Sequence, residues 1–325
     1  MIKIVVTGAN GMVGAAVVKN LYKDYVLVAI DRHKDRIAPF IEIANGLQFV
    51  MSDILSVSDW KAILGGAYAV VHLAANVHWT PRTSEEIANF YKVNAEGTRL
   101  LINKSAEYGV KKFLFFSTND VYRSSDHEID ESEPLDASSI YAKTKLEAEN
   151  LILQAYSNGP LDVLILRPAS IYGEYDTGSM TSLISLCKHG VVPVIGSGEN
   201  VKALLYVKEV ANFVRTYIGR EVLPGVSIAN IASGNYSFVQ IINTINDVFD
   251  LNSRVIKLPL FLKDNRIFAK SKNFQKLKAA SESKKVNFDK IKRSYGFVSS
   301  YDLKAGLTDS LEYYKEFCKL EKRKK

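Results

Sequence analysis

Short, nearly continuous apolar runs alternate with longer stretches of helical period along the first half of the chain. Six runs precede residue 169: KIVVTG, YVLVAID, LQFVMSD, AVVHLAA, KFLFFST and DVLILRP. Strands that helices cover on both faces have this composition. The helical stretches begin near Gly11, Trp60, Ser84 and Ile140. The pattern therefore predicts an α/β fold with a doubly wound parallel sheet.

The pattern changes after Pro168. Glycine and proline interrupt the chain at IYGEYDTGS, HGVVPVIGSGEN and EVLPGVS, and the regular alternation of strand and helix is lost. We therefore predict two lobes with a cleft between them. The larger lobe comprises residues 1–167 and 204–231, and the smaller, mixed α/β lobe comprises residues 168–203 and 232–325.

Composition indicates a globular protein, since 47% of the 325 residues are apolar. The two cysteines, Cys187 and Cys318, lie far apart with no Cys or His at metal-ligand spacing, so we expect neither a disulfide framework nor a metal site. The N-terminus lacks a basic leader, and no stretch reaches the roughly 18 apolar residues of a membrane span. These features predict a cytoplasmic protein without a membrane span.

The formal net charge of +7 is concentrated between Lys263 and Arg293, where 11 Lys and Arg residues face 3 Asp and Glu residues. A basic surface attracts anionic partners. This stretch lacks the aromatic and glycine pattern of a module that binds single-stranded nucleic acid. We interpret it as a solvated face and expect no nucleic-acid partner.

The run KIVVTGANGMVGAAVVKNL places three glycines between a strand and a helix with the spacing G-x-x-G-x-x-G. One glycine permits the tight turn, one lets a pyrophosphate approach, and one packs the helix on the strand. Free N–H groups at the positive end of the helix dipole then bind the phosphates. The run predicts a Rossmann-type dinucleotide turn with contacts from Gly8, Gly11, Met12, Val13 and Gly14.

The second and third predicted strands end in acidic residues. Asp31 follows Gly8 by 23 residues, where a carboxylate accepts hydrogen bonds from both ribose hydroxyls and repels a 2′-phosphate. This favours NAD over NADP as cofactor, although Arg32 beside it is able to tolerate the phosphate or stack on adenine. Asp53 and Ile54 are weaker candidates for an adenine contact, and helix capping is an equal alternative for Asp53.

Tyr141 and Lys145 lie four residues apart in IYAKTKLEAENLI, on one face of a predicted helix. A neighbouring ammonium stabilises phenolate and lowers a tyrosine pKa from about 10, so Tyr141 becomes a candidate general acid or base. Such a pair alone is usually an ordinary helix surface. It gains weight because it follows Thr118, a hydroxyl at the end of the fifth strand, by 23 residues.

With these motifs the chain resembles the extended short-chain dehydrogenase/reductase superfamily, in its nucleotide-sugar epimerase/dehydratase branch. The resemblance extends over nearly the whole chain. Its further motifs are HLAAN (72–76), VNAEGT (93–98), STNDVY (117–122), RPASIYG (167–173) and GSGENVKALLYVKEVA (196–211). It implies that residues 1–167 and 204–231 form an NAD-binding Rossmann domain and that the smaller lobe binds a nucleotide-diphosphate sugar. It also implies a homodimer built from the helices near Ser84 and Ile140.

The resemblance also assigns roles to individual residues. Thr118 would hydrogen-bond the reacting oxygen, Tyr141 would move its proton, and Lys145 would support both Tyr141 and the nicotinamide ribose. Asp120 would contact the substrate or cap a turn. Further cofactor contacts are implied at Leu73, Ala74, Ala75, Asn94, Ser117 and Pro168.

Two positions depart from the nucleotide-sugar pattern. Ser170 stands where the family commonly has an Asn that contacts the substrate diphosphate. Lys202 stands where an Arg often grips it, which keeps the charge but loses the bidentate fork. Both residues remain candidate substrate contacts, and both changes weaken the assignment to a UDP-sugar.

Asn119 restricts the reactions that the chain is expected to catalyse. It is an amide where the related dehydratases carry an acid, so elimination of water is disfavoured. Two reactions need only Thr118, Tyr141 and Lys145: 4-epimerisation through a transient 4-keto sugar with retained NAD, and reduction of a 4-keto deoxysugar by exchangeable NAD(P)H. Asp31 favours the first. A family member acting on a non-sugar alcohol is a further alternative, and a non-catalytic dinucleotide sensor is disfavoured because the Tyr/Lys pair is kept.

Overall fold

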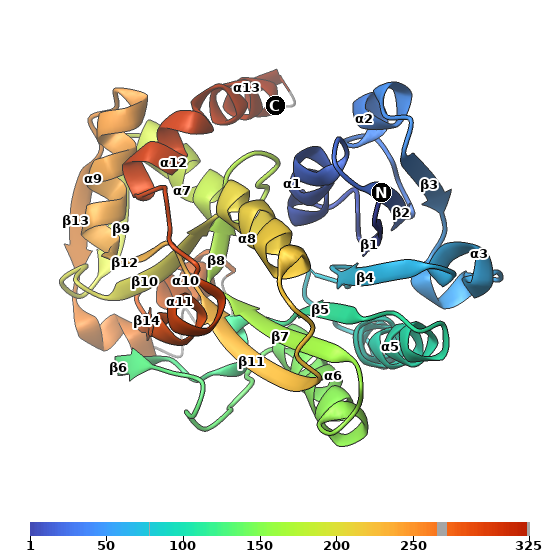
Figure 1. Ribbon diagram of the computed structural model, residues 1–325. Coiled ribbons are helices and arrows are strands. Elements are labelled where there is room, and N and C mark those ends of the chain that lie inside the picture. Colours follow the sequence, from blue (N-terminus) through green and yellow to red (C-terminus); the bar gives the residue numbers. More distant parts are fainter. Residues whose placement is uncertain (78, 265–271, 324–325) are drawn as a thin grey trace.

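The computed structural model describes residues 1–77, 79–264 and 272–323. A parallel sheet of seven strands occupies the larger lobe of this described part, in the order β11-β7-β5-β4-β1-β2-β3 (Figure 1). Its strands are β1 (Lys3–Thr7), β2 (Val26–Asp31), β3 (Leu47–Met51), β4 (Ala67–His72), β5 (Lys112–Phe116), β7 (Asp162–Pro168) and β11 (Gly225–Ile231). The six predicted strands and the doubly wound Rossmann-type sheet are confirmed. The order reverses between β1 and β4, which is where such sheets leave a crevice at the carboxyl ends of their strands.

Helices cover both faces of this sheet. On one face lie α1 (Met12–Leu21) and α8 (Val207–Gly219), and on the other lie α3 (Trp60–Leu64), α5 (Gly97–Glu107) and α6 (Ile140–Tyr156). The remaining helices of this lobe are α2 (Ala38–Ile43) and α4 (Ser84–Tyr91), which continues through a π-helical turn (Lys92–Glu96) into α5. The predicted helix starts agree with the structure to within one residue.

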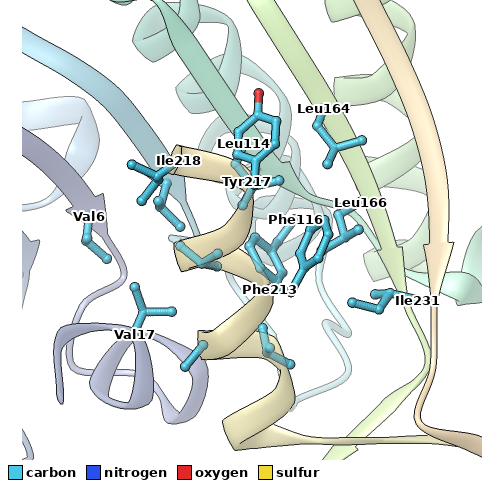
Figure 2. Close-up of a cluster of buried hydrophobic side chains, with 14 of the residues drawn as sticks. Val6, Val17, Leu114, Phe116, Leu164, Leu166, Phe213, Tyr217, Ile218 and Ile231 are labelled. Atoms are coloured by element: carbon cyan, nitrogen blue, oxygen red, sulfur yellow. The ribbon is translucent and has the colours of Figure 1, made fainter. Parts of the chain in front are cut away.

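The packing of α8 shows how the layers are held together (Figure 2). Phe213, Tyr217 and Ile218 recur at helical spacing and are at most 2% exposed. They lie against strand residues that include Leu114 and Leu166, both fully buried. Burying each Phe, Leu or Ile side chain of this kind stabilises the fold by about 1.5–3 kcal/mol relative to leaving it in water. The helix is therefore fixed on the sheet by its apolar stripe.

The smaller lobe is built on a mixed sheet in the order β12-β10-β14-β6, with β8 also paired to β10. Its strands are β6 (Ser125–Ile129), β8 (Ser170–Tyr172), β10 (Val201–Tyr206), β12 (Gly234–Ser237) and β14 (Lys284–Val286), and a separate parallel pair is formed by β9 (Val191–Ile195) and β13 (Arg254–Leu258). Its helices are α7 (Ser179–Lys188), α9 (Phe238–Phe249), α10 (Lys272–Ala280), α11 (Asp289–Tyr295), α12 (Leu303–Asp309) and α13 (Leu311–Arg323). Short 3₁₀ helices are formed by Leu260–Asp264 in this lobe and by Ile54–Ser56 and Asn119–Val121 earlier in the chain. The predicted domain bounds themselves stay a prediction.

The basic stretch from Lys263 to Arg293 falls partly on residues 265–271, which lie outside the described residues. Its described part forms α10, β14 and α11 and packs into the smaller lobe. Lys284, in β14, is half-buried. The interpretation of the whole stretch as a solvated face is therefore wrong for Lys284. Within the described ranges, no helix combines the length and the apolar character that crossing a membrane requires.

Candidate active site

A cleft of about 480 Å³ opens at the carboxyl ends of the main-sheet strands, and residues of both lobes line it. Most of the residues singled out from the sequence lie along it. They are Gly8, Gly11, Met12, Val13, Gly14, Asp31, Arg32, Asp53, Ile54, Leu73, Ala74, Ala75, Ser117, Thr118, Asp120, Tyr141, Lys145, Pro168 and Ser170. Their individual roles stay predictions, but the structure brings them to one place.

The glycine turn after β1 leaves no room for a side chain at Gly8 or Gly14. A Cβ on Gly8 would lie 2.7 Å from the main chain of Leu73 and Ala74, and a Cβ on Gly14 would lie 2.1 Å from the carbonyl oxygen of Gly8. Gly8 also has a φ of 67°. Helix α1 begins beyond Gly11 without a side-chain cap, so its first N–H groups remain for a ligand. This close main-chain cradle fits the pyrophosphate of NAD.

The carboxylate of Asp31 is fixed by main-chain donors. Its Oδ2 accepts a hydrogen bond from the N–H of Asn10 at 2.9 Å, and its Oδ1 accepts one from the N–H of His33 at 3.2 Å. A carboxylate held at this strand end fits an unphosphorylated adenosine ribose and repels a 2′-phosphate. Asp53 lines the same end of the cleft and also caps a 3₁₀ turn through the N–H of Leu55 at 2.9 Å.

Thr118 follows β5 and caps the 3₁₀ turn Asn119–Val121. Its Oγ1 accepts a hydrogen bond from the N–H of Asp120 at 3.1 Å, so its own hydroxyl proton remains for another acceptor. The Asp120 carboxylate pairs with Lys284 Nζ at 3.0 Å, and the same ammonium donates to the carbonyl of Asn119 at 3.3 Å. Lys284 comes from the smaller lobe, and its sequence context gave no sign of this contact.

Tyr141 and Lys145 project from the first turns of α6, one helical turn apart. Lys145 Nζ donates to the carbonyl of Phe116 at 2.7 Å and lies 4.8 Å from the ring centre of Phe115. Burial lowers the pKa of Lys145 to about 7, and the charge of Glu149 opposes that shift. Burial raises the pKa of Tyr141 well above its ordinary value, with a further contribution from Asp120. This direction is opposite to the lowering expected from the sequence, because burial disfavours the charged phenolate.

A buried ion pair beneath these residues was not anticipated from the sequence. Glu149, one turn after Lys145, pairs with Arg167 at 2.5 Å, and both side chains are at most 2% exposed. Glu149 also accepts a hydrogen bond from Ser117 Oγ, and Arg167 donates to Tyr122 Oη at 2.6 Å. The pair therefore ties α6 to the ends of β5 and β7, which carry cleft residues.

Two predicted contacts are not among the cleft residues. Asn94 is buried in the π-helical turn, where its Oδ1 accepts from the N–H of Asn76 at 2.7 Å and its Nδ2 donates to Thr144 Oγ1 at 2.9 Å. It thus holds Asn76, which does line the cleft. Lys202 Nζ donates to the carbonyl of Ala279 at 2.7 Å, away from the cleft lining.

Sequence reasoning missed the segment 173–179, whose residues Tyr175 to Ser179 line the cleft from the smaller lobe. Asp176, 4% exposed, accepts hydrogen bonds from the N–H of Gly178 at 2.6 Å and of Thr181 at 3.1 Å. Its Oδ2 also accepts from Tyr314 Oη at 3.2 Å. Arg36 lines the cleft from the larger lobe. The glycines of this segment were visible in the sequence, but Tyr314, which anchors Asp176, lies 138 residues away.

Comparison with known proteins agrees with this geometry. A sequence model of the "NAD dependent epimerase/dehydratase family" matches residues 4–232. N-acetyl-α-D-glucosaminyl-diphospho-ditrans,octacis-undecaprenol 4-epimerase of Escherichia coli O157:H7 is 27% identical over 328 residues, covering 95% of this chain and 94% of that protein. dTDP-D-glucose 4,6-dehydratase of Mus musculus is 30% identical over 230 residues, covering 66% of this chain and 64% of that protein. The solved structure of UDP-glucuronic acid 4-epimerase from Bacillus cereus, in complex with UDP-glucuronic acid and NAD, superimposes with a TM-score of 0.81 at 21% identity, over 97% of this chain and 100% of that one.

Proposed function

The chain belongs to the NAD dependent epimerase/dehydratase family and is an NAD-dependent enzyme of the extended short-chain dehydrogenase/reductase type, and from that premise we propose that it inverts carbon 4 of a nucleotide-diphosphate hexose. The observation that carries the proposal is the cleft itself. Thr118, Tyr141 and Lys145 line it together with the glycine turn. Together with bound NAD as hydride acceptor and donor, these side chains would suffice for oxidation and re-reduction at one carbon.

Each residue of the trio has one task in this proposal. Thr118 Oγ1 donates its free proton to the oxygen on carbon 4, and Tyr141 Oη takes the hydroxyl proton during oxidation and returns it during reduction. Lys145 Nζ supplies the positive charge that favours the Tyr141 phenolate, which burial otherwise disfavours. Bound NAD would supply the two-electron acceptor and donor. The sugar passes through a 4-keto form and can be reduced on its other face.

Elimination of water is disfavoured by the neighbours of Thr118. Asn119 carries an amide that is unable to protonate a leaving hydroxyl, and its side chain is nearly buried. Asp120, the remaining acid of the turn, is paired with Lys284. These two residues support epimerisation over the dehydratase activity named for the Mus musculus relative.

A second candidate substrate is a hexose on a polyprenyl diphosphate. The Escherichia coli relative whose name states that substrate class aligns with 95% of this chain. Ser170 and Lys202 replace the Asn and Arg with which nucleotide-sugar enzymes commonly contact the diphosphate. This candidate shares the trio and differs only in the carrier on the far side of the diphosphate.

The test begins with the protein as purified. Absorbance and mass spectrometry identify a co-purifying cofactor, and UDP-, GDP- and dTDP-hexoses and undecaprenyl-diphosphate N-acetylglucosamine are then supplied with NAD. We expect retained NAD and a 4-epimer detected by NMR. Loss of water from the sugar, or stoichiometric consumption of NAD(P)H by a 4-keto sugar, would contradict the proposal.

We also propose that the active form is a homodimer through α4 and α6. These helices pack side by side along the surface of the larger lobe, at the starts that the sequence indicated. Size-exclusion chromatography with light scattering measures the mass directly. A monomeric mass at the assay concentration would contradict this proposal.

A further inference from the structure

Tyr175 has a backbone conformation that is rare for its residue type. Its φ is 67°, and Asp250 is the other described residue besides glycine with a positive φ. Asp250 ends α9 in the left-handed conformation, which aspartate adopts readily at helix ends. A bulky aromatic residue in this region is strained, and such strain persists only where the surrounding structure enforces it.

The ring of Tyr175 lies against the nucleotide-binding lobe. Its centre is 5.2 Å from the guanidinium carbon of Arg36, a distance at which a cation interacts with an aromatic face. Arg36 is itself fixed: its N–H donates to Asn10 Oδ1 at 2.8 Å and its Nη1 donates to the Asn10 carbonyl at 3.2 Å. Asn10 in turn holds Asp31. Tyr175 therefore contacts the group that shapes the ribose end of the cleft.

A second contact runs in parallel. Glu174 pairs with Lys19 of α1 at 3.1 Å. Two consecutive residues of the segment 173–179 thus reach across from the smaller lobe to the helix and the loop that flank the glycine turn. Tyr175 and Arg36 both line the cleft along which the dinucleotide would lie.

The far side of the segment is anchored in the smaller lobe. The N–H of Gly173 donates to Tyr314 Oη at 2.9 Å, and Tyr314 donates to Asp176 at 3.2 Å. Tyr313 donates to the Asp176 carbonyl at 3.0 Å, and its ring meets the edge of Tyr175 with centres 5.9 Å apart. The smaller lobe therefore holds the segment at Gly173 and Asp176, and the larger lobe contacts it at Glu174 and Tyr175 in between.

We propose that Tyr175 and Arg36 close over the bound dinucleotide and slow its release, which makes NAD a resident rather than an exchanging cofactor. The inference rests on the proposed function. Epimerisation is redox-neutral only if the two electrons removed from carbon 4 return to the same sugar, so the cofactor has to stay through the whole cycle. Tyr175 is thus a retention residue that separates epimerisation from net oxidation.

The test measures NAD release without sugar. Wild-type protein and variants are loaded with NAD, freed of excess by gel filtration, and chased with etheno-NAD while fluorescence is followed. Tyr175→Ala and Arg36→Met are each expected to raise the release rate about tenfold, because each removes one partner of the contact. Tyr175→Phe keeps the ring and is the matched control, with a rate close to that of the wild type.

Tyr175→Gly distinguishes a role in NAD retention from a role in stability, because glycine lacks the ring but adopts the same φ without strain. We expect fast release with an unfolding temperature equal to or above that of the wild type. Release from Tyr175→Ala and Tyr175→Gly within twofold of the wild-type rate would overturn the proposal, as would rapid loss of NAD from the wild type. Slow NAD release with no turnover of any sugar would instead overturn the proposed function and leave the retention role standing.

Discussion

The glycine turn after β1 and the segment 173–179 face the same cleft, yet different kinds of contact hold them. The glycines of the turn are fixed by main-chain atoms close by, as in the hydrogen bond from the N–H of Gly11 to the Gly8 carbonyl at 3.0 Å. The segment is fixed by side chains from both ends of the chain, with Lys19 on one side and Tyr314 on the other.

This difference determines which of the two regions can be recognised from the sequence. A main-chain approach of 2.1 Å to a missing Cβ permits glycine alone, so the contact is written into residue type and spacing. A tyrosine hydroxyl on a carboxylate is able to come from anywhere in the chain. The turn can therefore be recognised as a sequence motif, whereas the contacts of the segment can be recognised only in the folded structure.

Tyr141→Phe has the largest expected effect and tests whether side chains carry out the chemistry while the main chain binds the cofactor. If the chemistry resides in side chains and cofactor binding in the main chain, this variant loses turnover by about 10²–10⁴-fold, because the proton carrier is gone. NAD affinity, measured by calorimetric titration, should stay within about twofold of the wild type. Turnover near the wild-type rate would contradict the assignment of Tyr141.

Gly14→Ala tests the main-chain side. The added Cβ would meet the Gly8 carbonyl, and overpacking of this kind typically costs about 1–3 kcal/mol in the free energy of unfolding. We also expect a clear loss of NAD affinity, since the turn has to move. Gly219→Ala is the matched control, because a Cβ there meets nothing within 4 Å and favours helix. Equal stability of the two variants would refute the steric argument.

The pH dependence of turnover tests the charge on Lys145. Its pKa is lowered to about 7, chiefly by burial, so the ammonium that supports Tyr141 is lost as pH rises through that value. We expect kcat/KM to fall about tenfold per pH unit above it. Arginine keeps its charge at every accessible pH, so Lys145→Arg should abolish the fall of kcat/KM above pH 7. We expect its kcat/KM to be lower than that of the wild type. A fall of the same steepness in that variant would exclude Lys145 as its cause.

The same shift affects the stability of the cofactor-free protein. Because the folded pKa of Lys145 is lowered, the unfolded chain binds more protons between about pH 7 and the ordinary lysine pKa of 10.5. Its contribution to the free energy of unfolding should therefore increase with pH across that window. Subtracting the pH profile of Lys145→Met from that of the wild type, both from urea titrations, isolates the contribution.

The smallest effect is expected from Lys284→Met. Asp120 is 57% exposed, so its ion pair with Lys284 should contribute less than about 1 kcal/mol to the free energy of unfolding. Loss of the ammonium nevertheless frees Asp120 beside Thr118, and we expect KM for the sugar to rise severalfold. Lys285→Met, which removes an exposed pair with Glu128, is the matched control. Equal KM values in both variants would place Lys284 outside the site.

Much of the larger lobe follows from the sequence, because strands covered on both faces are continuously apolar and the glycine turn admits one residue type. The rest depends on register and distance. β11 lies in a region whose glycines and prolines hid a strand that is formed by pairing with β7. Lys202 matches a family position, yet its ammonium bonds to the carbonyl of Ala279. Lys284 reaches Asp120 only because β14 pairs with β6 and β10.

The close contact between Gly8 and Gly14 restricts the laboratory evolution of this enzyme. Mutant libraries at these positions would consist almost entirely of damaged proteins, whatever coenzyme was selected for. Arg32 is exposed, and Asp31 and Arg36 are partly so, at the edge of the same cleft. Coenzyme preference can therefore be changed by substitutions at these three residues, while the glycine turn has to stay as it is.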